Sequence, residues 1–396
     1  MEINFLQISE QIYPETLNHR RYLHQNPELS FNEIYTTKYI SSILKSLDIE
    51  HKFALKSSPE KSDNNIGVVA WLGKGEQSIA LRADIDALPI SEETNFSFSS
   101  TKPGIMHACG HDIHTAMLLS VAKILKQYEA FLPNKVIMIF QPGEEQLPGG
   151  AKLILDSQIL DEFNIKAFYG QHINPEIPVG KIATKPGPLM ASTDEFHIKI
   201  IGKSTHAAQP HLGADPIFAA NNLINFLYSL PTKYANPLEP VLIAITAFNS
   251  GNATNIVPDE AKLMGTMRTY NQDLRNKLKS LIAEHSKNIV QSYGCKLQFD
   301  IVEGYPPLLN NDKCVDIVIN SIFSHLGKDY FTQAEPKMWA EDFAYYSQFA
   351  PSCFWFLGCG SQSMDFYPLH NPKLNPIEES MIFGTALMAS LAFTDI

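Results

Sequence analysis

The stretch HACGHDIH, residues 107–114, gathers three histidines, a cysteine and an aspartate that could bind metal or carry out nucleophilic chemistry. Cys109 and His111 are two positions apart, which would put them on different faces of a helix, but a turn at Gly110 lets both converge. A thiolate with an imidazole suits zinc, manganese, cobalt or nickel. The same residues also fit a polar loop with one buried cysteine, or a thiol nucleophile with a histidine base. We expect Asp112 to cap the helix that follows.

Further side chains that can bind metal follow apolar runs that we predict to be strands. Glu144 and Glu145 come after IMIF and a Pro-Gly turn, His172 comes after AFYGQ, and Asp84 and Asp86 follow SIALRA. The carboxyl ends of the strands in an open α/β sheet form the edge where ligands bind, so we expect these groups to meet there. Each alone also fits solvated charge, a turn cap or a surface histidine. Their convergence favours a metal site, with both aspartates orienting its ligands.

Two patterns describe the elements that would position these groups. Through residue 185, and again after residue 306, helical patterns alternate with strands such as VVAWL and VIMIF. This alternation indicates an α/β fold with a mostly parallel central sheet covered by helices. Between 189 and 306 the predicted order is βαββαβ, the ferredoxin-like unit. We therefore predict a catalytic domain in two parts, 1–188 and 307–396, interrupted by an inserted ferredoxin-like domain over 189–306.

Composition narrows the classes of function. A chain of 396 residues is longer than one hydrophobic core usually supports, which favours two domains. The net charge of −11 argues against nucleic acid or an anionic membrane as a partner, and no apolar stretch is long enough to span a bilayer. The five cysteines are scattered, and the N-terminal residues lack the pattern of a secretory signal. We expect a cytoplasmic protein without a disulfide framework.

Nine motifs spread over nearly the whole chain resemble one family, the dinuclear-metal aminoacylase/carboxypeptidase peptidases. Within it they are similar to the auxin-conjugate (IAA–amino acid) and hippurate N-acyl-amino-acid amidohydrolases. The Cys-Gly-His-Asp, paired-Glu and Leu-His-x-Pro elements together make the resemblance specific. In chain order the motifs are RRYLHQNPELSFNE, RADIDALPI, MHACGHDIHTAMLL, FQPGEEQLPGGA, GQHINPEIPVG, STHAAQP, NIVPDEA, GTMRT and AEDFAYY followed by LHNP.

The resemblance implies roles for individual residues. It implies two divalent ions per subunit (manganese, zinc, cobalt or nickel) and Glu144 as general base. It also implies a homodimer in which His206, often supplied by the other subunit, stabilises the oxyanion. Asn255 and Arg268 would hold the carboxylate of the substrate. The implied metal ligands are Cys109, His111, Glu145, His172 and His370.

The activity implied is hydrolysis of N-acyl-L-amino acids, of the N-acetyl, benzoyl or indole-acyl type, to a carboxylic acid and a free amino acid. A metal-activated water would attack the amide carbonyl. The alternatives are a dipeptidase or carboxypeptidase using the same site, a metal-free cysteine amidase using Cys109, and a metal-dependent binding protein. Glu144 argues against the last, because a binding protein needs no base.

Some positions depart from the family pattern. Gln171 stands where a leucine often precedes the ligand histidine, and Ala340 where a glycine or serine often precedes Glu-Asp-Phe. QLP at 146–148 and NPKLNP after the last ligand also differ from the usual runs. These departures bear on the shape of the acyl pocket and leave the ligands and base in place. The sequence leaves His107 and His114 open between orienting ligands and plain packing.

Overall fold

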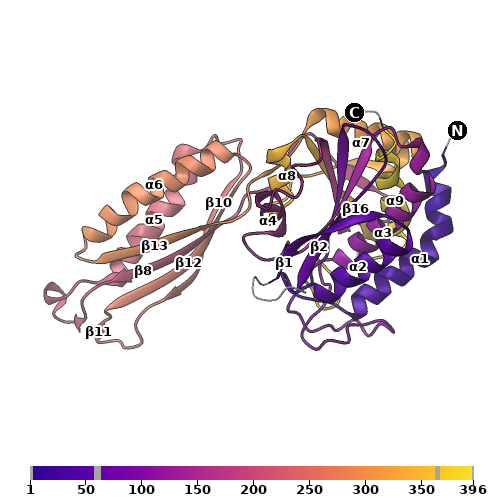
Figure 1. The fold of residues 1–396 in the computed structure, drawn as a ribbon. Helices are drawn as coiled ribbons and strands as arrows, with labels where there is room; N and C mark the ends of the chain where they lie inside the picture. Colours follow the sequence, from indigo (N-terminus) through magenta and orange to yellow (C-terminus); the bar gives the residue numbers. More distant parts are fainter. Residues whose placement is uncertain (1–2, 58–63, 362–365, 395–396) are drawn as a thin grey trace. The chain divides into compact units, whose positions relative to one another are not determined.

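The computed structural model describes residues 3–57, 64–361 and 366–394, and the chain divides into two compact units (Figure 1). The larger unit comprises Met1–Leu189, Leu309–Glu335 and Asp342–Ile396. The smaller unit comprises Met190–Leu308 and the short segment Pro336–Glu341. Two short paired strands, β7 (Gly187–Met190) and β14 (Leu308–Asn310), lie where the chain passes from one unit to the other.

An eight-stranded sheet forms the centre of the larger unit, in the order β1-β2-β4-β3-β5-β16-β6-β15. Its inner strands β4, β3, β5 and β16 run parallel, while the pairs β1–β2, β2–β4 and β16–β6 are antiparallel. The predicted α/β class is therefore confirmed, with a sheet that is parallel in its inner part and mixed towards its edges. The strands are β1 (Glu50–Lys56), β2 (Asn65–Leu72), β3 (Ser78–Asp84), β4 (Lys135–Gln141), β5 (Ile165–Pro178), β6 (Ile182–Thr184), β15 (Phe331–Gln333) and β16 (Ser352–Gly360).

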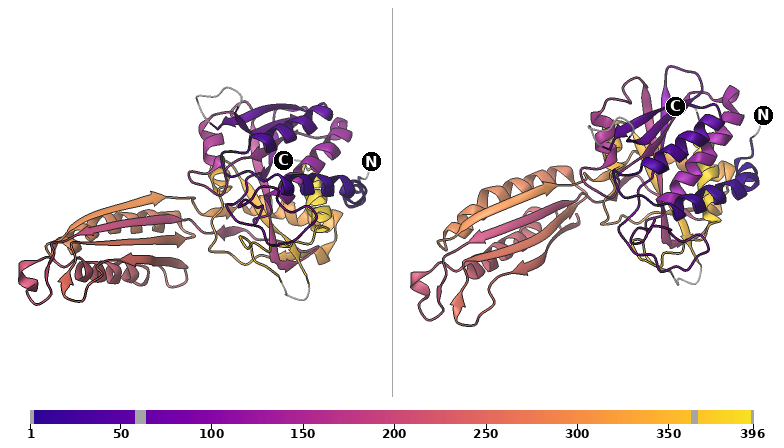
Figure 2. Two further views of the ribbon diagram at one scale, coloured as in Figure 1. Left: turned by 90° about the horizontal axis from the view of Figure 1, so that it is seen from below. Right: turned by 60° about the horizontal axis from the view of Figure 1, so that its bottom comes forward.

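Helices cover both faces of this sheet. On one face α3 packs against β3, β4 and β5 and is itself covered by α1 and α9, which explains why nearly every residue of α3 is buried (Figures 1 and 2). Figure 1 shows α4 and α8 on the other face. The helices are α1 (Phe5–Gln25), α2 (Ile34–Ser46), α3 (His111–Gln127), α4 (Gly150–Asp156), α7 (Asp312–His325), α8 (Ala344–Phe349) and α9 (Ser380–Leu391).

The inner strands are buried on both faces because helices cover both. All seven residues of β3 and all nine of β16 are buried. Strand β1 at the edge has a single buried residue, Ala54, and its charged sequence EHKFALK gave no strand signal. Among the described residues, none of the helices combines the length and apolar character needed to cross a bilayer.

The smaller unit is a four-stranded antiparallel sheet, in the order β10-β12-β8-β13, with two helices packed on it (Figure 2). Burial alternates along β12, as expected for a sheet with one covered face. A two-stranded ribbon of β9 (Thr205–His206) and β11 (Ile256–Val257) extends from it. The other elements are β8 (Asp194–Ile201), α5 (Pro216–Tyr234), β10 (Val241–Asn249), β12 (Glu260–Thr269), α6 (Gln272–Gln291) and β13 (Lys296–Glu303).

Candidate metal centre

The HACGHDIH stretch turns sharply just before α3. Gly110 has φ +84°, in the left-handed region, and a Cβ at this position would overlap the side chain of Ile173. Helix α3 begins at the next residue, His111. The turn points Cys109 towards β5, where its Sγ lies 3.3 Å from Nε2 of His172.

Six side chains of the larger unit bring their donor atoms together beside this turn. Glu144 and Glu145 follow β4. His370 comes from a loop near the C-terminus, and its own backbone N–H donates to the carbonyl of Ala108 at 2.8 Å. The donor atoms form overlapping groups, each within 4.8 Å: Cys109, His111 and His172; Cys109, Glu145 and His370; and His111, Glu144 and Glu145. These six are the side chains to which the family resemblance assigns metal binding and the general base.

Hydrogen bonds orient the imidazoles so that one nitrogen of each faces the cluster. Nδ1 of His111 lies 3.1 Å from Oδ1 of Asp86, and Nδ1 of His172 donates to the carbonyl of Ile173 at 2.7 Å. In both rings Nε2 is left for the cluster, and such hydrogen bonds from the far nitrogen are typical of metal-binding histidines. Nε2 of His111 is buried and has no hydrogen-bond partner among the described residues, and it lies 4.0 Å from Oε1 of Glu145.

The charges of this cluster fit divalent cations. Burial opposes protonation of His111, but Asp84 and Asp86 outweigh it and raise the pKa of the ring to about 10. The site therefore attracts positive charge, which a cation bound at Nε2 would supply in place of the proton. Thiolate, imidazole and carboxylate donors together suit zinc and similar divalent ions. The donor set and the orphaned nitrogen fit the family's pair of metal ions.

The same environment argues against Cys109 as a free nucleophile. Burial, followed by the nearby carboxylates of Glu145 and Glu144, raises the pKa of this thiol well above its usual value. Reactive cysteines instead lie in electropositive surroundings that lower the pKa of the thiol. A thiolate at Cys109 needs a cation beside it to balance its charge. A bound metal ion would be such a cation, with Cys109 as its ligand.

Asp84 connects the cluster to the sheet beneath it. Its carboxylate accepts from Nη1 of Arg82 at 2.6 Å and lies 2.6 Å from Nδ1 of His114. Nε2 of His114 accepts a hydrogen bond from the backbone N–H of Ile173 at 2.9 Å. Both ring nitrogens are therefore used, and the ring fixes the strand that carries His172.

His107 is different, because both of its nitrogens are buried without a hydrogen-bond partner among the described residues. Burial lowers the pKa of His107 to about 4.

Asp112 is not the helix cap that the sequence predicts, since Gly110 occupies that position. Its buried carboxylate lies 2.8 Å from Nδ1 of His24 and 3.0 Å from Nε of Arg20, both on α1. Sequence reasoning gave neither of these residues a role, although both lie in the motif RRYLHQNPELSFNE. The long-range ion pair outcompetes a local cap because it satisfies two charges that are buried together.

The prediction that His172 directly follows a strand is also wrong, because β5 continues to Pro178 and includes it. Neighbouring residues in a strand point to opposite faces. Gln171 therefore faces away from the cluster, where its Oε1 accepts from the indole N–H of Trp355 at 3.1 Å and its amide contacts Met117. The departure at Gln171 consequently changes the core behind the sheet and not the shape of an acyl pocket.

The smaller unit carries the other three predicted residues. His206 and Asn255 lie together on the β9–β11 ribbon, where Ala207 N–H donates to the carbonyl of Asn255 at 3.0 Å, and both side chains are exposed. Arg268 is half-buried on β12, and its Nη1 donates to the carbonyl of Met338 at 3.1 Å. Arg268 lies near the end of β12, whereas the ribbon adjoins its beginning, roughly 26 Å away along the strand. The structure therefore brings His206 and Asn255 together and holds Arg268 apart from them.

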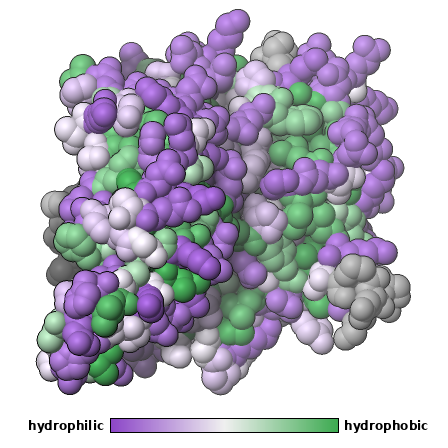
Figure 3. All heavy atoms as spheres, turned by 90° about the vertical axis from the view of Figure 1, so that its left-hand side faces the viewer, coloured by the Kyte–Doolittle hydropathy of each residue, from purple (hydrophilic) through white to green (hydrophobic). Residues whose placement is uncertain are grey.

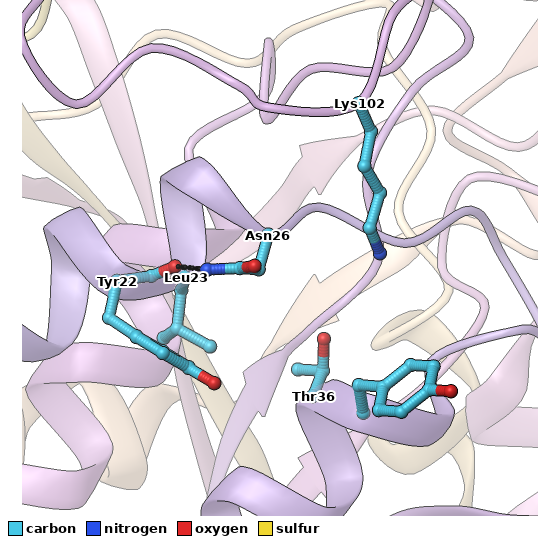
Figure 4. Close-up of a pocket in the computed structure, with 6 residues that line it drawn as sticks. Tyr22, Leu23, Asn26, Thr36 and Lys102 are labelled. Atoms are coloured by element: carbon cyan, nitrogen blue, oxygen red, sulfur yellow. Dashed lines mark hydrogen bonds between the residues drawn. The ribbon is translucent and has the colours of Figure 1, made fainter.

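A pocket of about 280 Å³ lies elsewhere on the larger unit, between the end of α1 and the beginning of α2 (Figure 4). Figure 4 shows Asn26 turned back on its own helix, with its amide donating to the carbonyl of Tyr22 at 2.8 Å. The residues that line it are Tyr22, Leu23, Asn26, Tyr35, Thr36 and Lys102. None of the six donors of the cluster is among them, so this pocket is separate from the candidate metal centre.

The chain is similar to known proteins in both sequence and fold. Residues 80–394 match the model of peptidase family M20/M25/M40. The chain is 39% identical over 366 residues to N-acetyl-L-cysteine deacetylase of Bacillus subtilis, covering 92% of this chain and 84% of that protein. It is 34% identical over 381 residues to IAA-amino acid hydrolase ILR1-like 4 of Arabidopsis thaliana, covering 94% and 84%. The crystal structure of the Bacillus subtilis YXEP protein, described as a dinuclear metal binding peptidase from the M20 family, superimposes with a TM-score of 0.81 at 33% identity, covering 97% and 98%.

The contact between Asp86 and His111 gives a testable prediction. Replacing Asp86→Ala removes the group that orients this imidazole and accepts the backbone N–H of Glu145. We expect the affinity for manganese or zinc to fall by about 10- to 100-fold. Competition with a fluorescent chelator measures this affinity, with Asp48→Ala, at an exposed carboxylate, as the control. Unchanged affinity in Asp86→Ala would show that His111 is not a ligand held by this bond.

Proposed function

The chain belongs to peptidase family M20/M25/M40 and is a metal-dependent hydrolase of amide bonds, and we propose that its substrates are N-acyl amino acids. One observation carries the proposal: the two glutamates after β4 meet Cys109 and three histidines at the carboxyl edge of the sheet. Two relatives that match more than nine-tenths of the chain are named as a deacetylase of N-acetyl-L-cysteine and a hydrolase of IAA–amino acid. The products would be a carboxylic acid and a free amino acid.

Glu144 is the proposed general base. Its side chain is buried, and its carboxylate is grouped with the donor atoms of His111 and Glu145. Cys109, His111, Glu145, His172 and His370 would hold the metal ions, which when bound would supply the Lewis acidity that polarises an amide carbonyl and lowers the pKa of water. Glu144 takes the proton of the attacking water and delivers it to the nitrogen of the leaving amino acid. A carboxyl group suits both steps because it first accepts and then donates the same proton.

The smaller unit supplies the proposed contacts to the substrate. Arg268 can bind the carboxylate of the amino acid through two parallel hydrogen bonds. Burial lowers the pKa of its guanidinium, yet the group remains a cation at neutral pH. His206 can donate to the oxyanion that forms on the carbonyl, and Asn255 lies beside it on the same ribbon.

We propose that His206 and Asn255 serve one site and Arg268 of the same copy serves another, so that two subunits complete each site. The roughly 26 Å of β12 between the two positions is too long for one copy to bring both to one small substrate. The smaller unit also exposes large apolar side chains, including Phe218, Phe248, Ile256 and Met264. Figure 3 shows apolar residues between hydrophilic ones on one face of the molecule. A homodimer would cover such residues and complete the site.

The cytoplasmic location stays a prediction.

Hydrolysis of a substrate panel tests this function. The panel contains N-acetyl, N-benzoyl and indole-acyl amino acids beside plain dipeptides, and the protein is stripped with chelator and then reloaded with manganese, zinc, cobalt or nickel. We expect metal-restored release of free amino acid from acylated substrates, because an acyl group leaves no α-amine that would need an acidic partner. Activity on dipeptides alone would overturn the substrate class. Activity untouched by the chelator would overturn the metal mechanism.

Glu144→Gln separates catalysis from metal binding. The amide has the shape of the carboxylate but cannot accept the proton of water, so turnover should fall below detection. Both metal ions should remain, because Glu144 is assigned to none of the ligand positions. Elemental analysis measures the metal content of the variant. Turnover of the best substrate of the panel measures its catalysis. Retained turnover means that the base is assigned to the wrong residue.

Co-expression of two inactive variants tests the shared site. His206→Ala should lose on the order of 100-fold to 1000-fold in kcat, the usual cost of removing an oxyanion donor. When it is co-expressed with Glu144→Gln, mixed dimers contain one intact site, and activity should return to about a quarter of the wild-type value. The control pairs Cys109→Ala with Glu144→Gln, both in the larger unit, and should stay inactive. Failure of the first mixture to recover would place His206 in the site of its own subunit.

A further inference from the structure

The segment 28–33 between α1 and α2 has no role in the reaction described so far, yet it contacts the loop that carries Glu144 and Glu145. We propose that Glu33 is a positioning residue that holds this loop, so that Glu144 is placed to act as the base. The inference rests on the proposed function of Glu144, and it assigns a task to the motif NPELSFNE. Three contacts carry it.

The first contact is a buried hydrogen bond. Oε1 of Glu33 accepts the backbone N–H of Gly143 at 2.7 Å, and Glu33 is 0% exposed. Glu33 also occupies the N-cap position of α2, but its side chain makes no capping hydrogen bond there. The cap is provided by Glu28, whose Oε2 accepts the backbone N–H of Thr36 at 2.8 Å. The carboxyl of Glu33 is therefore used for the loop and not for its own helix.

The second contact is between Phe31 and Gly143. The ring of Phe31 lies so close to Gly143 that a Cβ at this glycine would overlap it. Both residues have positive φ, +63° for Phe31 and +65° for Gly143. A phenylalanine rarely adopts this conformation, and such strained residues persist where the surrounding structure fixes them, often next to functional sites. The ring of Phe31 contacts the loop at Gly143, two residues before Glu145.

The third contact runs through Asp86. Ser30 donates from Oγ to Oδ2 of Asp86 at 2.7 Å, and the same oxygen accepts the backbone N–H of Glu145 at 2.9 Å. The amides of Gly143 and Glu145 are thus each held by a buried carboxyl group, and Glu144 is the residue between them. Fixing both neighbours restricts the directions in which the Glu144 side chain can point, which is the preorganisation that a general base requires.

The oxygen of Glu33 that accepts from Gly143 determines which substitution keeps the contact. Burial, followed by the nearby charge of Asp86, raises the pKa of Glu33 well above its usual value. Glutamine has the same length, is neutral and retains the accepting oxygen. Methionine has a similar volume but offers no oxygen to Gly143.

The experiment compares Glu33→Gln, Glu33→Met and the control Glu28→Met with the wild type. Glu33→Met should lower kcat by about 100-fold, the effect of a small misplacement of a catalytic group, with KM and metal content nearly unchanged. Glu33→Gln should restore kcat to nearly the wild-type value. Glu28→Met should weaken the start of α2 and leave kcat unchanged. Normal kcat in Glu33→Met, or equal loss in both Glu33 variants, would overturn the inference.

Amide hydrogen exchange in the metal-free protein provides a second measurement that does not depend on activity. The peptide spanning 141–150 should exchange faster in Glu33→Met than in the wild type, Glu33→Gln or Glu28→Met. If Glu33→Met does not fold, Ser30→Ala, which removes one hydroxyl, should speed exchange at Glu145. Unchanged exchange would overturn the inference. A wild-type protein that hydrolyses none of the panel would contradict the proposed function, while the exchange data would still decide whether Glu33 holds the loop.

Discussion

Negative charge buried at the edge of the sheet is the constraint on which the rest of the larger unit depends. Asp84, Asp86 and Glu144 are at most 6% exposed, and a thiol lies among the carboxylates. Buried carboxylates are unfavourable unless positive charge or hydrogen bonds accompany them. The chain supplies Arg82 beneath the edge, where its guanidinium binds both Asp84 and Asp342. Above the edge of the sheet, a protonated histidine or a bound cation has to balance the negative charge that Arg82 leaves uncompensated.

That constraint explains why so many distant segments meet at the site. The carboxyl groups come from the ends of β3 and β4, the thiol from the turn before α3, and His370 from a loop more than 250 residues away in the chain. His370 is held in place by a backbone bond to Ala108 and has φ +64°, an unusual conformation for a histidine. The parallel inner strands make the meeting possible because their carboxyl ends lie at one edge.

The sequence indicated the side chains that the structure brings together in the cluster, but little of what surrounds them. Cys109 and His111 could be placed together because Gly110 signals a turn, and the two glutamates because a Pro-Gly pair ends their strand. The role of Asp112 could not be predicted, since a local cap and a bond to His24, 88 positions earlier, look alike in the sequence. The same holds for Glu33, whose partner Gly143 is 110 positions away. Strand β5 continued past His172 because its pairing with β16 extends through this histidine, and tertiary pairing of this kind leaves no local signal.

Anomalous X-ray scattering from crystals of the manganese-loaded protein tests the central claim most directly. The account predicts two peaks in each subunit, close enough to share ligands, with Cys109, His111, Glu145, His172 and His370 at bonding distance. Glu144 should lie beside the pair without bonding to either ion. A single peak, or peaks away from these five side chains, would contradict the account of a dinuclear site built at the carboxyl edge of the sheet.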